Sequence, residues 1–177
     1  MTLFWVVWTA VIVQRIVELI YAKRNERWMR ERGAVEHGRS HYKWIVLVHG
    51  GFFAALLLEW LTGAGALHPF WPVFLALFIV VQGMRIWILQ SLGRFWNTKI
   101  LVIPGEKRVE KGAYGKIRHP NYIIVTLELI IMPLIFQAYF TLLVFTLLNA
   151  FILLYIRIPA EEKALGITGG SDPVNTD

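Results

Sequence analysis

Five apolar runs, each close to the length of a membrane-crossing helix, constrain this 177-residue chain more than any other feature. A bilayer core about 30 Å thick takes roughly 20 residues of α-helix to cross. The runs cover residues 2–21, 44–61, 71–91, 122–137 and 139–158. Hydrophobic residues make up 56% of the chain and charged residues only 17%, which is too apolar for an ordinary soluble domain. The sequence therefore predicts an all-α integral membrane protein with about five transmembrane helices.

The connections between the runs predict a single membrane domain over residues 1–177. The last two runs are separated only by a tight connection around Gln137 and Ala138, so we expect them to form an antiparallel hairpin. The fourth run is short and contains Pro133, which predicts a kink or an incomplete crossing. The first run has no basic stretch before it and no small-residue cleavage site after it, which favours a retained helix over a cleaved signal peptide. The polar tail 169–177 is predicted to be disordered.

The basic residues predict how the helices are oriented. Segments 23–43 and 92–121 each carry seven Lys and Arg residues, whereas segments 62–70 and 137–139 carry none. Because loops rich in Lys and Arg stay in the cytoplasm, we expect the N-terminus outside the membrane and the C-terminus in the cytoplasm. The net charge of +6 is then explained by topology, with contact to anionic lipid as a second role. It gives no support to nucleic-acid binding.

Charged residues also occur inside the apolar runs, where they are costly and usually paired. Arg85 and Glu128 each lie six residues from the cytoplasmic end of their run, about 9 Å deep at the helical rise. Arg15 and Glu18 lie at a similar depth on the first run and share one helix face. Two interpretations stay open. The four residues form an ion-pair network between helices, or Arg85 and Glu128 bind substrate at the inner wall of a cavity.

A polar cluster before the fourth run has the features of a binding turn. It reads G-A-Y-G-K-I-R-H-P-N-Y over residues 112–122. Gly112 and Gly115 permit tight backbone conformations and close approach of a ligand. Pro120 suits the first turn of a helix and holds His119 in an extended conformation. Free amides at such a helix start favour an anionic group, although a basic loop beside a membrane is also a common structural feature.

A second polar cluster, R-I-P-A-E-E over residues 157–162, closes the last run. Arg157 and Glu161 are four residues apart, the spacing at which helical side chains meet. Pro159 removes one backbone bond, so we expect the fifth helix to kink or end there and a short helix to begin with Glu161 and Glu162 in its first turn. Because the last two runs form a hairpin, the two polar clusters are predicted to meet in space.

Together the clusters resemble those of the isoprenylcysteine carboxyl methyltransferase family. The resemblance lies in G-x-Y-x-x-x-R-H-P-x-Y, an apolar hairpin and then R-x-x-x-E-E-x-x-L, over roughly the last 70 residues. The upstream stretch L-G-R-F-W-N-T at 92–98 is also similar to the segment that precedes these motifs in the family. The first two runs carry no signal specific to the family.

The resemblance implies a membrane enzyme that uses S-adenosylmethionine without a Rossmann domain. Its cofactor-binding region would cover about residues 92–168. By similarity, the cofactor would contact Glu106, Lys107, Arg108, Val109, Tyr114, His119, Pro120, Asn121, Tyr122 and Glu161. Arg157 and Glu161 would be the catalytic residues, with Arg157 facing the acceptor group of the substrate. The lipophilic part of the substrate would enter from the bilayer between helices.

The resemblance implies O-methylation but does not choose the methyl acceptor. A carboxylate is already ionised and would need only Arg157 to orient it. A phenol or enol would need a proton acceptor, for which Glu161, Glu128 and His119 are candidates. Lipid-like acids and long-chain phenolic or pyrone polyketides therefore stay open as substrates. The chain has no cysteine, and its histidines at 37, 41 and 49 lack convincing ligand spacing, so we expect no metal site.

Three other functions remain possible on the sequence. A phospholipid N-methyltransferase would share the cofactor and the membrane setting but methylate an amine. A membrane reductase with a related C-terminal hairpin would bind NADPH. A helix bundle without catalytic activity would bind neither cofactor.

Overall fold

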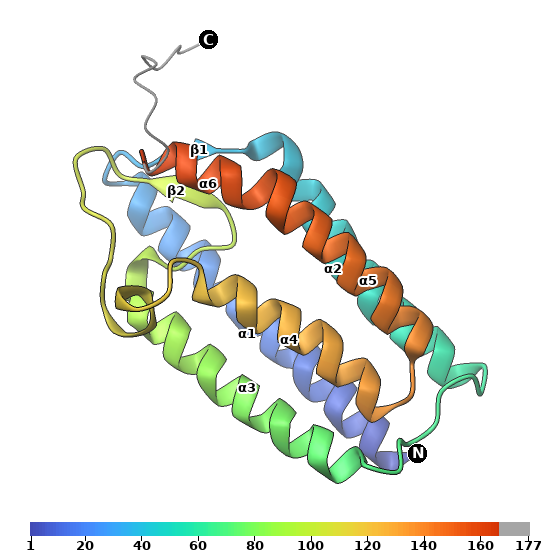
Figure 1. Ribbon diagram of the computed structural model, residues 1–177. Helices are drawn as coiled ribbons and strands as arrows, with labels where there is room; N and C mark the ends of the chain where they lie inside the picture. Colours follow the sequence, from blue (N-terminus) through green and yellow to red (C-terminus); the bar gives the residue numbers. More distant parts are fainter. Residues whose placement is uncertain (167–177) are drawn as a thin grey trace.

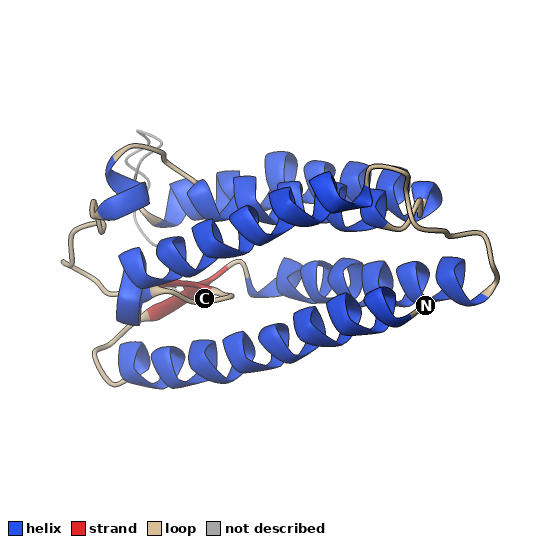
Figure 2. Cartoon of the chain, turned by 90° about the horizontal axis from the view of Figure 1, so that it is seen from below, coloured by secondary structure: helices blue, strands red, loops and turns tan. Residues whose placement is uncertain are grey.

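The computed structural model, which describes residues 1–166, is built around five apolar helices where the apolar runs predict them. They are α1 (Thr2–Arg30), α2 (Arg39–Leu61), α3 (Trp71–Leu92), α4 (Pro120–Ile135) and α5 (Tyr139–Ile152). A short helix, α6 (Ile158–Ala164), follows α5. The helices lie side by side in an elongated bundle (Figures 1 and 2). The predicted all-α membrane fold is therefore confirmed, while the tail 169–177 lies outside the described residues.

Four helical segments are long and apolar enough to cross a membrane: Thr2–Arg30, Arg39–Leu61, Trp71–Phe95 and Tyr139–Ala164. Helix α4 has 16 residues, about 24 Å at the helical rise, and so is shorter than a bilayer core. Large apolar side chains such as Leu143, Leu147 and Leu154 lie exposed on the outside of the bundle. An apolar exterior over several long helices is what a multi-pass membrane protein presents to lipid.

The core joins the N-terminal end of α1 to α2 and to the turn between α4 and α5. Phe4 stacks on Trp60 with ring centroids 4.5 Å apart and meets Phe136 edge-on at 5.0 Å. The α4–α5 connection is as tight as predicted, with Gln137 at a φ of 51°. Glu59, near the end of α2, accepts hydrogen bonds from the backbone N–H groups of Phe140 (3.2 Å) and Thr141 (2.7 Å). It therefore satisfies free amides in the first turn of α5.

A small antiparallel sheet at the opposite end of the bundle was not predicted. Strand β1 (Val35–His37) pairs with β2 (Ile100–Val102), with Glu36 opposite Leu101. The sheet ties the connection between α1 and α2 to the long connection between α3 and α4. Figure 1 shows it beside α6 and the C-terminal end of α1, at the end that also carries the short 3₁₀ helices η1 (Gly93–Phe95) and η2 (Gly112–Gly115). The two basic connections and α6 thus lie at one end, as the alternating topology predicts.

The passage from α5 to α6 differs from the expected kink or break. A single π-helical segment, η3 (Leu153–Arg157), joins the two helices, and α5, η3 and α6 run on as one helical rod (Figure 1). Pro159 lies in the first turn of α6, where its missing N–H costs little. Glu161 lies in that first turn, as predicted. The π-helical segment ends at Arg157, two residues before the proline, and the Arg157 side chain is buried.

Candidate active site

The two polar clusters recognised in the sequence meet at the start of α4. The hydroxyl of Tyr122 donates a short hydrogen bond to Glu161 Oε2. Arg157 Nε donates to the same Tyr122 oxygen at 3.1 Å. The predicted Arg157 and Glu161 are therefore brought together, but Tyr122 joins them in place of a direct ion pair. The hairpin of α4 and α5 causes this meeting because it returns the chain to the end at which α4 begins (Figure 1).

Arg157 is held from a second side by a segment far away in sequence. Its Nη2 donates to the backbone carbonyl of Thr98 at 2.8 Å, and the Thr98 hydroxyl lies 3.1 Å from the hydroxyl of Tyr42. The remaining nitrogen, Nη1, is buried and has no hydrogen-bond partner within residues 1–166. An unpaired buried donor costs about 1–3 kcal/mol, more when charged. Arg157 is thus fixed by two bonds, and its Nη1 has no partner in residues 1–166.

His119 forms the opposite wall of the cluster, directly before α4. Its ring stacks on Tyr122, with centroids 5.4 Å apart and planes 20° from parallel. Its Nε2 lies 3.2 Å from Glu162 Oε1, and its Nδ1 lies 3.8 Å from Glu161 Oε2. Arg118 also reaches Glu162, at 3.4 Å. The turn before α4 and the start of α6 are therefore joined by ionisable side chains on both sides of Tyr122.

Tyr114 closes the site from the loop before α4. It lies in η2, and it packs against the hydrophobic core. Burial raises the pKa of the Tyr114 phenol, and the negative charge of Glu161 raises it further. Gly112, at a φ of 56°, makes this loop possible, since an added Cβ would lie 2.3 Å from the Ser91 hydroxyl oxygen. The phenol of Tyr114 therefore stays protonated near a carboxylate.

The other residues that the resemblance assigns to the cofactor differ in burial and in their hydrogen bonds. Arg108 is half-buried, and its Nη2 donates to the carbonyl of Arg118 at 2.6 Å. Val109 is also half-buried, and Pro120 is buried in the first turn of α4. Asn121 Oδ1 is buried with no hydrogen-bond partner among the described residues. Two further expected residues, Glu106 and Lys107, are exposed, and no side-chain hydrogen bond ties them to the cluster within residues 1–166.

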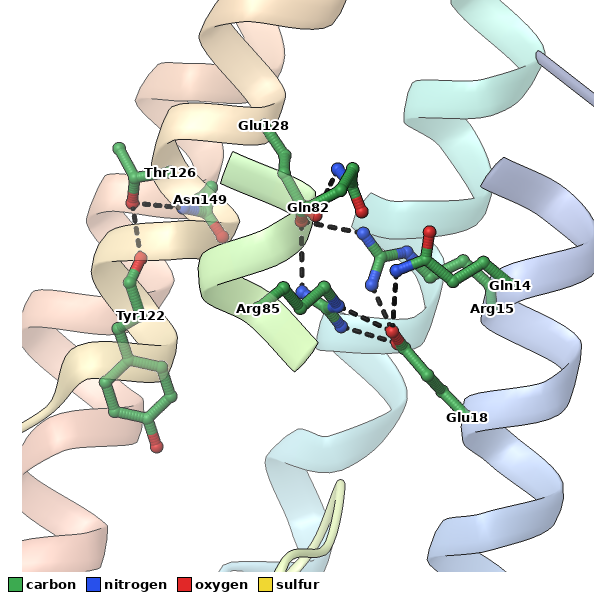
Figure 3. Close-up of polar contacts among 9 residues, drawn as sticks. All are labelled: Gln14, Arg15, Glu18, Gln82, Arg85, Tyr122, Thr126, Glu128 and Asn149. Carbon is green, nitrogen blue, oxygen red and sulfur yellow. Dashed lines mark hydrogen bonds and ion pairs between the residues drawn. The ribbon is translucent and has the colours of Figure 1, made fainter. Parts of the chain in front are cut away.

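The four charged residues inside the helices form one network (Figure 3). Arg85 donates from Nε and Nη2 to Glu18, both at 2.6 Å, and from Nη1 to Glu128 at 3.0 Å. Arg15 also bridges the two carboxylates, at 2.8 Å to Glu18 and 2.6 Å to Glu128. Two glutamines add to the network: Gln82 donates to Glu128 at 2.8 Å and Gln14 donates to Glu18 at 3.0 Å. Two guanidiniums and two carboxylates thus balance one another across α1, α3 and α4.

This network favours helix association over direct substrate contact. The cavity beside Arg15, His49 and Glu128 has a volume of about 20 Å³. A space of that size holds about one water molecule and no lipid group. Substrate binding by Arg85 and Glu128 therefore stays a prediction, whereas the interhelical ion pairs expected from the sequence are present.

Sequence reasoning missed Thr98 and Tyr42 as parts of the site. Thr98 acts through its backbone carbonyl, which the type of side chain does not reveal. It does lie in segment 92–98, which resembles the family in sequence but whose role the sequence does not specify. Tyr42 lies near the start of α2, five residues before Leu47, in a helix that carries no family-specific signal.

Comparisons with known proteins identify a family for the segment that carries this cluster. A sequence model of the isoprenylcysteine carboxyl methyltransferase (ICMT) family matches residues 74–167, which is more than half of the chain. The chain is similar to the uncharacterized protein YpbQ of Bacillus subtilis, with 44% identity over 92% of this chain and 96% of that protein. It is also similar to an uncharacterized protein of Haemophilus influenzae, with 26% identity over 90% of this chain and 93% of that one. No solved structure matches the chain.

Proposed function

The chain belongs to the isoprenylcysteine carboxyl methyltransferase family, a family of membrane methyltransferases, and we propose that it uses S-adenosylmethionine to O-methylate a lipophilic acceptor. The proposed site is the cluster of Tyr122, Arg157 and Glu161 at the start of α4 and α6. Its proposed setting is the cytoplasmic side of a bacterial cell membrane, where both basic connections would lie.

The side chains of the cluster suit S-adenosylmethionine. This cofactor combines a sulfonium, an ammonium and a carboxylate with a nucleoside. Glu161 and the stacked rings of His119 and Tyr122 offer a carboxylate and aromatic faces for the cationic part. Asn121 Oδ1 is a buried acceptor without a partner in residues 1–166, which a ligand donor would satisfy. Cations that suit the ligand's carboxylate are available at Arg108 and Arg118.

The unused donor of Arg157 is the observation that carries the proposal for the acceptor. Its Nε and Nη2 are engaged by Tyr122 and Thr98, so the guanidinium plane is fixed before any substrate arrives. Its Nη1 is left without a partner in the part of the chain described. A carboxylate or hydroxyl oxygen would satisfy this nitrogen and be oriented by it. Arg157 is therefore proposed to hold the acceptor oxygen in line with the methyl group.

Little further chemistry is required of the protein. When bound, S-adenosylmethionine supplies an electrophilic methyl group on its sulfonium. The site would accelerate transfer by holding the acceptor in line and by excluding water from it. A carboxylate acceptor needs no base, whereas a phenol or enol would pass its proton to a nearby acceptor, for which Glu161 and His119 are placed beside Tyr122.

A comparison of ligands in a thermal-shift assay tests the proposed cofactor. The full chain in detergent should melt at a higher temperature with S-adenosylmethionine than without it and be unaffected by NADPH. Binding at 100 times the dissociation constant would contribute about 2.7 kcal/mol. Stabilisation by NADPH alone would instead indicate a reductase, and stabilisation by neither would oppose catalysis by this site. Identification of the methylated product then separates O-methylation from methylation of an amine headgroup.

A further inference from the structure

A pocket lined in part by two arginines lies beside the C-terminal turns of α1, separate from the candidate active site. It has a volume of about 330 Å³ and is lined by Tyr21, Arg24, Asn25, Trp28 and Arg94. Four of these residues lie along the last turns of α1, and Arg94 comes from η1, directly after α3. The pocket thus lies between the ends of two long helices, at the end of the bundle that carries the sheet (Figure 1).

The pocket carries two arginines, Arg24 and Arg94, and no carboxylate within residues 1–166 forms an ion pair with either. The acidic residue nearest in sequence to Arg24 on α1, Glu26, is engaged by Arg30 and Lys99, each at 2.8 Å. Two guanidiniums beside one pocket, neither paired with a carboxylate in the described part of the chain, form a site that favours a phosphate or other anion.

The walls of the pocket are held in place by contacts within the fold. Asn25 is buried and donates through Nδ2 to the carbonyls of Gly93 (3.2 Å) and Trp96 (2.7 Å), which fixes η1 against α1. The Arg94 guanidinium lies over the Trp28 ring, 5.5 Å from its centroid. Tyr21 stacks on Trp96 with centroids 6.0 Å apart. The site is therefore largely formed before a ligand binds.

The surface that leads to the pocket identifies the source of the anion. Val13, Val17 and Ile20 are each more than half exposed, and with Arg24 they follow the i, i+3 and i+4 spacing of one helix face. This apolar stripe ends about 6 Å before Arg24 at the helical rise. An acyl chain fits along such a stripe, and the phosphate of the same lipid would then meet the cations at the pocket. Tyr21 and Trp28 are of the residue types that favour this boundary.

From this arrangement we propose that the pocket binds the phosphate-bearing headgroup of an anionic membrane lipid. Arg24 and Arg94 contact the phosphate, Tyr21 and Trp28 flank the headgroup, and the exposed stripe of α1 contacts one acyl chain. The pocket shares no residue with the cluster around Tyr122. Basic pockets between membrane helices on the positively charged side are the usual setting for such lipids.

Native mass spectrometry of the full chain in detergent tests this site. The protein is incubated with phosphatidylglycerol or with phosphatidylcholine, and the bound lipid is counted. Each Lys or Arg near a headgroup favours an anionic lipid by about fivefold, so the double variant Arg24→Gln/Arg94→Gln should lower the preference for phosphatidylglycerol about 25-fold. The matched control Lys23→Gln/Arg27→Gln removes the same charge from the same region of α1 outside the pocket and should retain the preference.

Further measurements make the outcome decisive. Because Arg24 and Arg94 are exposed, both double variants should stay monodisperse, and Arg24→Lys should keep the lipid preference that Arg24→Gln reduces. Equal losses in the two double variants would overturn the proposal in favour of general surface charge. Equal binding of the two lipids to the parent would overturn it as well. Stabilisation of the lipid-free protein by inorganic phosphate alone, of the same size as that by phosphatidylglycerol, would assign the pocket to a soluble anion and overturn the lipid source.

Discussion

Replacing Glu18 by leucine should destabilise the bundle strongly, and a second substitution, Arg85→Met, should restore part of the loss. Glu18 accepts two 2.6 Å bonds from Arg85, whose side chain is only 6% exposed, and one 2.8 Å bond from Arg15. Without Glu18, two guanidiniums face the single carboxylate of Glu128 inside the bundle (Figure 3). Removing Arg85 as well leaves Arg15 and Glu128 as a balanced pair, 2.6 Å apart.

The expected loss of stability in Glu18→Leu follows from the burial of the charge that loses its partner. Breaking a buried ion pair from one side costs about 3–5 kcal/mol, because the remaining charge is uncompensated. In a chain of this length each kcal/mol lowers the melting temperature by roughly 2–4 °C, so Glu18→Leu should lower it by about 6–20 °C. The double variant should melt at a higher temperature than either single variant, since it buries no unpaired charge.

Thermal unfolding in detergent, followed by circular dichroism, measures these shifts. Arg30→Ala is the control, because it removes an arginine that pairs with Glu26 and Glu36 at the exposed end of the same helix. Each of these exposed pairs should contribute less than about 1 kcal/mol. If Glu18→Leu lowered the melting temperature no more than Arg30→Ala, the network would not join the helices. The same would follow if the melting temperature of the double variant fell by the sum of the two single decreases.

Three further predictions concern the site and the topology. Tyr122→Phe removes the hydroxyl that bonds to Glu161 and should weaken S-adenosylmethionine binding about tenfold, measured by titration calorimetry. An unchanged affinity would show that the Tyr122 hydroxyl does not contribute to cofactor binding. Arg157→Ala should abolish turnover while keeping most of the cofactor affinity. Arg157→Lys should restore little turnover, because an ammonium cannot make two bonds in one plane. A parallel loss of stability and cofactor affinity would indicate a structural role for Arg157. Reporter fusions should place Arg30 and Gly105 in the cytoplasm and Ala66 outside, and an external Gly105 would contradict the proposed orientation.

Much of the fold could be predicted because long apolar runs leave few alternatives to a membrane helix. The bounds of α3 and α4 lie within two residues of their runs at both ends, but α1 continues to Arg30 and α2 begins at Arg39. The apolar runs end where charged residues begin, whereas the backbone hydrogen bonds of the helices continue into the charged segments. The strands β1 and β2 have three residues each, too few for an alternating pattern to be recognised, and their pairing depends on a partner far away in sequence.

The candidate site could be predicted in part because its side chains are ionisable or aromatic and lie in two compact motifs. The resemblance named His119, Tyr122, Arg157 and Glu161, and the structure gathers them at one place. It could not show that Tyr122 stands between Arg157 and Glu161, since the spacing of four residues equally allows a direct pair. The carbonyl of Thr98 was missed because every residue has one, and only the fold decides which carbonyl faces a guanidinium.

The affinity for S-adenosylmethionine of Glu161→Gln, compared with that of Glu31→Gln, tests the proposed function most directly. Glu161 accepts the Tyr122 hydroxyl in the proposed site, whereas Glu31 is an exposed carboxylate just beyond the end of α1. Titration of the purified full chain should give the parent and Glu31→Gln the same dissociation constant. Glu161→Gln should bind at least about tenfold more weakly, because a charge-assisted contact contributes roughly 1.5–3 kcal/mol. Equal affinities in all three proteins would contradict a cofactor site at Glu161.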